Sequence, residues 1–334
     1  MSNLIGSLIQ YSLIYCFIVG LILVLRGPTY RIAGARWAYA LWFTLFVPLL
    51  IPLAPWLLPT VFFSSSIEPY ALLERVKFVA STESAGIFTL ATVSIWLAGM
   101  MFTAWRVSHT SLRLKSALNA GSHGLTRSQQ REFSKVCSQL RVFPSPRVRV
   151  SPDLEGPAIC GMINPVVYLP VGFFDRFSAS ERTLMLYHEI CHYLRKDAWW
   201  NTLFCVLNCL FWFNPLFRFA ERRFRQDQER SCDQFVLWDE PRVQRARYAN
   251  AMLKIAASPS TYGPIHFQSN APEIVGRMTM LEQHKKTIPQ SLYGFVSMAL
   301  LVMAILIIAV PVIEANDTIS LSSGWCSIYQ GLGL

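Results

Sequence analysis

The chain has 334 residues, of which 53% are hydrophobic and 15% charged, and it carries a formal net charge of +10. This is too apolar for an ordinary soluble domain of that length, and it predicts an integral membrane protein. The positive charge would suit nucleic acid, but anionic lipid headgroups and retention of basic loops at the cytoplasmic side explain it more simply. Membrane lipids, and no direct nucleic-acid contact, are therefore expected.

Apolar runs long enough to cross roughly 30 Å of hydrocarbon occupy residues 3–25, 37–58, 86–105 and about 290–313. The first connection between them carries Arg26, Arg31 and Arg36, whereas the tail after residue 313 holds no Lys or Arg. Because basic loops stay in the cytoplasm, both termini are expected outside the cell and the long basic segment inside it.

These runs predict a mainly α membrane protein with four transmembrane helices and one cytosolic α+β domain. The expected parts are three transmembrane helices over residues 1–105, the cytosolic domain over 106–288, a fourth transmembrane helix over 289–313, and a short extracytoplasmic tail over 314–334.

The sequence His188-Glu189-Ile190-Cys191-His192 forms an H-E-x-x-H motif. On a helix, positions i and i+4 lie on one face, so both imidazoles can bind one Zn²⁺ while Glu189 stands beside the bound water as general base. A chance match is the alternative, and the surrounding segments must decide. Ser178 and Glu181 form a capping-box pattern that predicts the start of this helix.

Upstream of the motif, residues 148–150 and 166–169 read as short strands separated by turn residues. An extended segment here could bind the backbone of a peptide substrate as an added strand. The residues proposed for this substrate strand are Gly156, Pro157, Gly161 and Pro165.

Catalytic zinc needs a third protein ligand, with the fourth position left for water. Glu229 is the proposed ligand, and Asp233, four residues later on the same helical face, is proposed to support a histidine. The alternative is a solvated charged helix whose carboxylates pair with arginines. Asp197 follows the motif, and it could either orient a ligand or cap the next helix.

Residues 198–219 are apolar enough to cross the membrane, but a crossing would place Glu229 on the opposite side from His188 and His192. Asn208, Asn214 and Pro215 also interrupt the run. We therefore expect an interfacial or re-entrant helical hairpin.

Four motifs in this order resemble the BlaR/MecR antirepressor membrane metallopeptidases. They are the Gly-Pro segment that runs from Gly156 to Pro170, the H-E-x-x-H with Arg195-Lys196-Asp197, Trp212-Phe213-Asn214-Pro215, and Glu229-Arg230-Ser231-Cys232-Asp233. The resemblance covers roughly residues 1–313.

This resemblance implies a gluzincin-like zinc domain with one Zn²⁺ in a bacterial cytoplasmic (inner) membrane. It also implies signal-dependent cleavage of a cytoplasmic transcriptional repressor, in the regulation of antibiotic resistance. In the family's sensor proteins a penicillin-binding domain follows the last span, whereas residues 314–334 carry no S-x-x-K or K-T-G motif. A separate sensor protein is therefore compatible with this chain, as is a homodimer.

Two other functions stay open from the sequence. A quality-control membrane protease of the HtpX/Ste24 kind also pairs H-E-x-x-H with a distant Glu, and a non-catalytic receptor or scaffold would use zinc only structurally. Glu189 argues against the receptor, because zinc ligation alone does not require that carboxylate.

Overall fold

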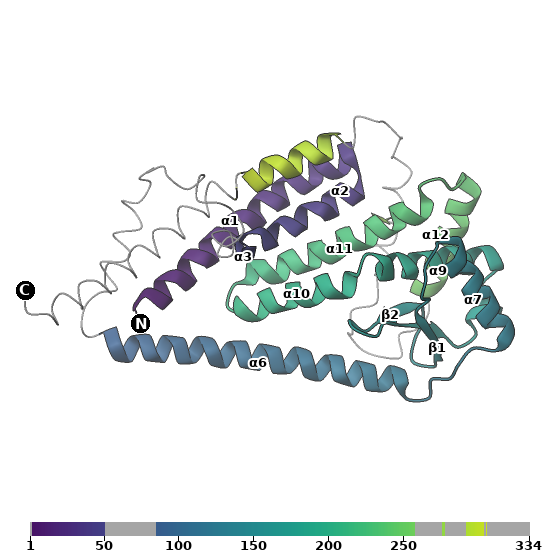
Figure 1. Ribbon diagram of the computed structural model, residues 1–334, viewed down its shortest axis with the longest axis horizontal. Coiled ribbons are helices and arrows are strands. Elements are labelled where there is room, and N and C mark those ends of the chain that lie inside the picture. The colour runs from purple at the N-terminus through teal and green to yellow at the C-terminus, as the bar shows by residue number, and fades with distance from the viewer. Residues whose placement is uncertain (1, 51–84, 258–275, 278–291, 304, 306–334) are drawn as a thin grey trace, which may run out of the picture. The chain divides into compact units, whose positions relative to one another are not determined.

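The computed structural model describes residues 2–50, 85–257, 276–277, 292–303 and 305 (Figure 1). The described chain is mainly helical, with one small sheet. It divides into two compact units, which consist of residues 1–101, 211–220 and 288–334 in the first and 102–210 and 221–287 in the second.

The first unit begins with α1 (Ser2–Ala33), followed by α2 (Ala35–Ala40), the 3₁₀ helix η1 (Leu41–Phe46) and α3 (Val47–Leu50). Ile18 and Ile22 of α1 and Trp42 of η1 are fully buried here. The second predicted span is thus helical up to residue 50, with a 3₁₀ segment between two α-helical ones. Its remainder lies outside the described residues. Part of the fourth predicted span forms the helix Leu292–Met303.

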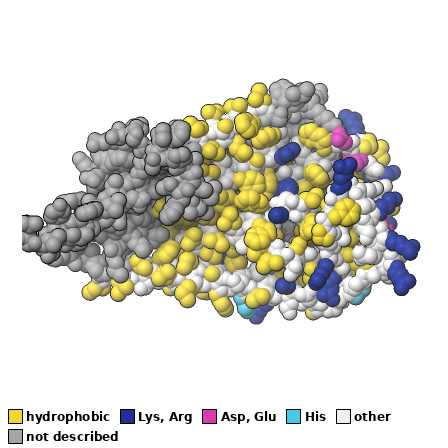
Figure 2. Space-filling model, viewed as in Figure 1, with side chains coloured by type: hydrophobic (Ala, Val, Ile, Leu, Met, Phe, Trp, Pro, Cys, Tyr) yellow, Lys and Arg dark blue, Asp and Glu magenta, His cyan; other side chains and the backbone are white. Residues whose placement is uncertain are grey.

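Two described helices, Ile9–Ala33 and Leu90–Asn119, are long and apolar enough to cross a membrane. The second belongs to α6 (Ala85–Asn119), which continues well past residue 105, where the sequence predicted the span to end. Large apolar side chains are exposed on both helices, among them Leu13, Val24, Leu90 and Ile95, and hydrophobic side chains cover much of the face in Figure 2. Such surfaces suit lipid rather than water.

The turn at residues 211–214 packs within the first unit. Trp212 Nε1 donates a hydrogen bond to the carbonyl oxygen of Trp96 (3.1 Å), and Trp212 lies so close to Gly99 that a Cβ there would clash. Phe211 stacks on Phe217, and both rings contact Tyr15 of α1. The Trp-Phe-Asn-Pro segment therefore has a packing role against two of the apolar helices.

In the second unit, α7 (Arg127–Gln139) precedes a three-stranded sheet of β1 (Arg147–Ser151), β2 (Ala158–Cys160) and β3 (Val166–Pro170). The strand order is β1-β3-β2, with β3 parallel to β1 and antiparallel to β2, so β2 lies at an edge. The strands predicted at 148–150 and 166–169 are confirmed. Gly161, with φ of 106°, turns the chain between β2 and β3, where a Cβ would lie 2.8 Å from the carbonyl oxygen of Asn164.

The remaining helices of this unit surround α9. They are α8 (Phe173–Arg176), α9 (Ala179–Leu194), α10 (Asp197–Leu210), α11 (Pro215–Leu237) and α12 (Arg242–Ala256). Leu186 and Ile190 of α9 are fully buried in a core that also contains Phe133 of α7 and Val167 of β3. Figure 2 shows Lys and Arg side chains over this part of the chain, with few acidic ones between them.

Helices α10 and α11 pack against each other within the second unit. Phe204 stacks on Phe224, and Asn208 Nδ2 donates to Glu221 Oε2 (2.7 Å). Residues 198–219, predicted as an interfacial or re-entrant helical hairpin, thus form most of α10, a turn and the start of α11.

Candidate metal centre

The helix α9 begins where the sequence predicted it. Ser178 Oγ accepts a hydrogen bond from the Glu181 amide, and Glu181 Oε2 accepts one from the Ser178 amide (2.8 Å). This capping box satisfies two backbone donors at the helix start. Since Leu186 and Ile190 fill the core, the neighbouring face of α9 presents His188 and His192 to the second helix of the site.

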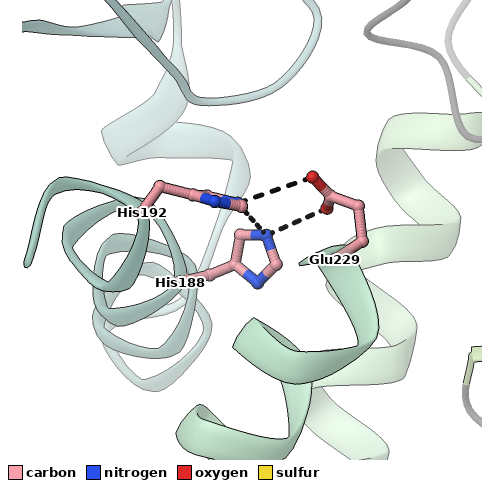
Figure 3. A group of neighbouring side chains, drawn as sticks. All are labelled: His188, His192 and Glu229. Atoms are coloured by element: carbon pink, nitrogen blue, oxygen red, sulfur yellow. Dashed lines mark hydrogen bonds and ion pairs between the residues drawn. The ribbon is translucent and has the colours of Figure 1, made fainter. Parts of the chain in front are cut away.

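His188, His192 and Glu229 converge as the sequence predicted (Figure 3). The two Nε2 atoms are 3.1 Å apart, and Glu229 oxygens lie 3.2 Å from His188 Nε2 and 3.5 Å from His192 Nε2. Two tetrahedral zinc ligands at 2.0–2.1 Å from the ion would be about 3.3 Å apart. The spacing of the three ligand atoms therefore fits one zinc ion.

Hydrogen bonds to the outer ring nitrogens set the histidine tautomers. His192 Nδ1 lies 2.7 Å from Asp197 Oδ2, and His188 Nδ1 lies 2.9 Å from the hydroxyl of Tyr248. That hydroxyl donates to Asp233 Oδ1 (2.8 Å), so it is free to accept from His188. Both imidazoles would then be neutral and protonated at Nδ1. Their Nε2 lone pairs would point towards each other and towards Glu229. Such an arrangement of lone pairs suits a cation between them.

The carboxylates around these histidines have shifted pKa values. Burial favours the neutral acid at Glu229, but His192, His188 and Arg277 outweigh it and hold its pKa well below the usual range. The pKa of Asp233 is lowered in the same way, chiefly by Arg277 against burial. Both side chains are thus anionic, which suits a cation site.

Glu189 differs from these two carboxylates. It lines the cavity beside the histidines, and burial raises its pKa despite the opposing influence of His188 and His192. A carboxylate whose pKa is moved towards neutrality is suited to accept and return a proton.

Arg277 supports both acidic residues from a position that sequence reasoning did not find. Its Nε lies 2.6 Å from Asp233 Oδ2, and its Nη2 lies 3.3 Å from Glu229 Oε2. Arg277 and Asp233 are 44 residues apart in the chain, and Tyr248 and His188 are 60 apart, so no local spacing connects them. The available hint was a single arginine within the apolar stretch Ile274-Val275-Gly276-Arg277-Met278.

A cavity of about 900 Å³ opens beside this centre. His188, Glu189, His192 and Glu229 line it, together with Gly156, Pro157, Gly161 and Pro165, the four residues that the sequence analysis proposed for substrate binding. The edge strand β2 lies on the cavity through Ala158 and Ile159. The geometry therefore brings an edge strand, a candidate base and a metal-ligand set to one cavity.

His192, Asp197 and Cys232 form a second group of potential ligands behind the first. Here the Arg195 guanidinium already supplies a positive charge. Its Nη1 lies 3.2 Å from Cys232 Sγ, and its Nε lies 3.3 Å from Asp197 Oδ1. The positive charge of this guanidinium would repel a second metal ion. Cys191 is buried and is hydrogen-bonded to Cys232.

Two histidines one turn apart on a helix, a glutamate beside the first of them and a carboxylate from a second helix form a metallopeptidase type of centre. Residues 7–281 match the model of the BlaR1 peptidase M56 family, and the chain belongs to that family.

Among curated proteins, the chain is similar to the regulatory protein BlaR1 of Bacillus licheniformis, with 34% identity over 107 residues, which is 32% of this chain and 18% of that protein. It is also similar to the methicillin resistance mecR1 proteins of Staphylococcus aureus and Staphylococcus epidermidis, with 27% identity over 135 residues, or 40% of this chain and 23% of each of those proteins. The alignments thus span less than a quarter of these relatives.

Proposed function

We propose that the chain is a membrane-bound zinc endopeptidase of the bacterial cytoplasmic membrane that cleaves a cytoplasmic protein. The observation that carries this proposal is the convergence of His188, His192 and Glu229 at a cavity that Glu189 also lines. A single Zn²⁺ held by these three residues would polarise the scissile carbonyl and acidify a water molecule.

The protein residues would divide the remaining work. Glu189 would take the proton of the attacking water and return it to the leaving amine. Asp197 and the Tyr248–Asp233 pair would keep the two histidines in the tautomer that leaves Nε2 for the metal. The edge strand β2, with Gly156, Pro157, Gly161 and Pro165 around it, would hold the substrate backbone as an added strand.

The substrate we propose is a transcriptional repressor, cleaved in response to an external signal. The relatives named for BlaR1 and for methicillin resistance support a regulatory role. A separate sensor protein and a homodimer are the partners we propose for signal reception.

The proposed topology has four transmembrane helices and both termini outside the cytoplasm. The catalytic domain over residues 106–288 would face the cytoplasm, with 198–219 at the membrane interface. The long exposed apolar faces of α1 and α6 support the membrane placement. The contacts of residues 211–217 with Tyr15 and Trp96 support a hairpin that rests against the spans.

The test compares wild type with Glu189→Gln, both zinc-loaded in membranes and each co-expressed with a candidate repressor. We expect cleavage of the repressor by wild type and a loss of cleavage with Glu189→Gln at unchanged zinc content. Glu240→Gln, outside the cavity, is the matched control. Equal processing by wild type and Glu189→Gln would contradict the proposal and favour the receptor or scaffold reading.

A further inference from the structure

Lys196 occupies a costly backbone conformation at the break between α9 and α10. Its φ is 55°, in the left-handed region that favours glycine. Its amide donates to the Tyr193 carbonyl (3.1 Å) and its carbonyl accepts from the Trp199 amide (2.9 Å), so the conformation is fixed from both sides. Lys196 is exposed and lines the metal-site cavity. A strained lysine at the wall of such a cavity points to a functional use of its side chain.

Arg222 of α11 lines the same cavity and is also exposed. Within the described part of the chain, neither Lys196 nor Arg222 forms an ion pair with a carboxylate. The neighbouring Arg225, by contrast, is paired with Glu221 at 2.8 Å. The carboxylates of the metal centre are already engaged, because Asp197 contacts His192 and Glu229 contacts Arg277. The wall formed by the break between α9 and α10 and by α11 therefore offers two positive charges without an ion-pair partner among the described residues.

The loop between β1 and β2 contributes the opposite charge. Asp153 and Glu155 both line the cavity there. A peptide in the cavity would thus meet basic groups from the helices and acidic groups from the loop. This difference would favour one charge pattern in the substrate over its reverse, because complementary charges set register and reject wrong partners.

We propose that Lys196 and Arg222 form a specificity subsite for a carboxylate of the peptide substrate, supplied by an acidic side chain close to the scissile bond. This inference rests on the proposed peptidase function and names the substrate chemistry of that site. A lysine ammonium and an arginine guanidinium both bind carboxylates through charge-assisted hydrogen bonds.

The chain offers a matched pair of variants for the test, Lys196→Gly and Arg141→Gly. Arg141 is the other described non-glycine residue with positive φ (54°), it is exposed, and it lies outside the cavity lining. Each substitution removes one positive charge and places glycine where the backbone favours it. If Lys196→Gly loses the substrate preference and Arg141→Gly keeps it, the loss is therefore due to the missing lysine side chain and not to a change in the fold.

The measurement is kcat/KM for a cleavable peptide in which each position in turn carries Glu or Gln. At low salt, wild type should favour Glu at one position by roughly five-fold, the scale of a partly exposed ion pair. Lys196→Gly and Arg222→Gln should both reduce this ratio towards one, and Arg141→Gly should keep it. A Glu preference that survives in Lys196→Gly, or that Arg141→Gly abolishes equally, would overturn the inference.

Two further arms separate the alternatives. Peptides with a free or an amidated C-terminus test whether the subsite binds the C-terminal carboxylate. A preference for the free C-terminus without a preference for Glu over Gln would contradict an acidic side chain as the ligand. Binding of the Glu and Gln peptides to zinc-loaded Glu189→Gln, measured by fluorescence anisotropy, tests charge preference without cleavage. Cleavage without charge preference would refute only this inference, whereas preferential binding without any cleavage by wild type would refute only the proposed peptidase.

Discussion

His192 Nδ1 lies 2.7 Å from Oδ2 of Asp197, and this carboxylate is 2% exposed. The sequence left open whether Asp197 orients a ligand or caps the next helix, and the contact with His192 favours the orienting role. Supporting carboxylates of this kind raise the basicity of a ligating histidine and fix its ring. We therefore expect Asp197→Asn to weaken zinc binding by roughly 10–100-fold, as measured by competition with a chelator of known affinity.

Asp175→Asn, an exposed replacement on α8, is the control for the chemistry of the substitution. The circular dichroism of both variants should match that of wild type. Zinc affinity of Asp197→Asn equal to that of wild type would mean that Asp197 serves only the start of α10.

The hydroxyl of Tyr248 connects Asp233 to His188 through bonds of 2.8 and 2.9 Å. The Tyr248→Phe variant keeps the fully buried ring but removes these bonds. It should destabilise the protein by about 1–3 kcal/mol, because two buried polar groups lose a partner. Weaker zinc binding should accompany this loss, since His188 Nδ1 is then held less firmly.

Comparison of chelator-induced zinc loss in Tyr248→Phe and Tyr193→Phe provides the check. Tyr193 also lines the cavity, but its hydroxyl donates to the Pro144 carbonyl (3.3 Å) and not to a residue of the metal centre. A faster zinc loss with Tyr193→Phe than with Tyr248→Phe would contradict the connecting role of Tyr248.

Asp233 and Arg277 form a buried pair, 0% and 3% exposed, whose Nε–Oδ2 distance is 2.6 Å. Removal of one partner leaves an uncompensated charge, so Arg277→Met should destabilise the protein by about 3–5 kcal/mol. The double variant Asp233→Asn with Arg277→Met should cost less than the sum of the single variants. Denaturant unfolding in detergent measures all three.

Arg225→Met supplies the contrast for a surface pair. Its guanidinium contacts Glu221, but its side chain is 47% exposed, and such pairs contribute about 0–1 kcal/mol. Strict additivity of the Asp233 and Arg277 substitutions would show that the two side chains do not interact energetically.

Local periodicity explains which parts of the site the sequence could predict. His188 and His192 share a helical face by their spacing, and Glu229 with Asp233 repeats the same spacing on α11. The capping box at Ser178 and the short strands around Gly161 are also local signals. Tyr248 and Arg277 enter the site only through tertiary packing of distant segments, which no spacing rule encodes.

The limits of the α6 helix show that a predicted membrane span and a helix need not end at the same residue. Hydrophobicity marked 86–105 as a span, but the helix continues to Asn119 because nothing in residues 106–119 breaks it. The hydropathy of a segment indicates whether lipid or water surrounds it. The length of a helix depends instead on whether its residues favour the helical backbone. The boundary predicted at residue 105 therefore falls inside a continuous helix.

Glu181 links the start of α9 to α12, because its Oε1 lies 2.7 Å from Lys254 Nζ. Burial alone would raise its pKa, but the hydrogen bonds from Lys254 and Ser178 outweigh burial and lower the pKa below its usual 4.5. A depressed folded-state pKa stabilises the protein above pH 4.5, and this stabilisation is lost as the pH falls through the folded value. Glu181→Gln should therefore be less stable than wild type at pH 7, and the difference should shrink on acidification.

Thermal unfolding in detergent from pH 7 down to pH 3 measures this difference. Lys254→Met removes the partner instead of the acid, so its difference from wild type should shrink over the same range. Lys254 is 44% exposed, and solvent therefore screens part of the interaction. If the gap between wild type and Glu181→Gln stayed constant across this pH range, the pKa of Glu181 would not be lowered in the folded protein, and neither Lys254 nor Ser178 would favour its anionic form.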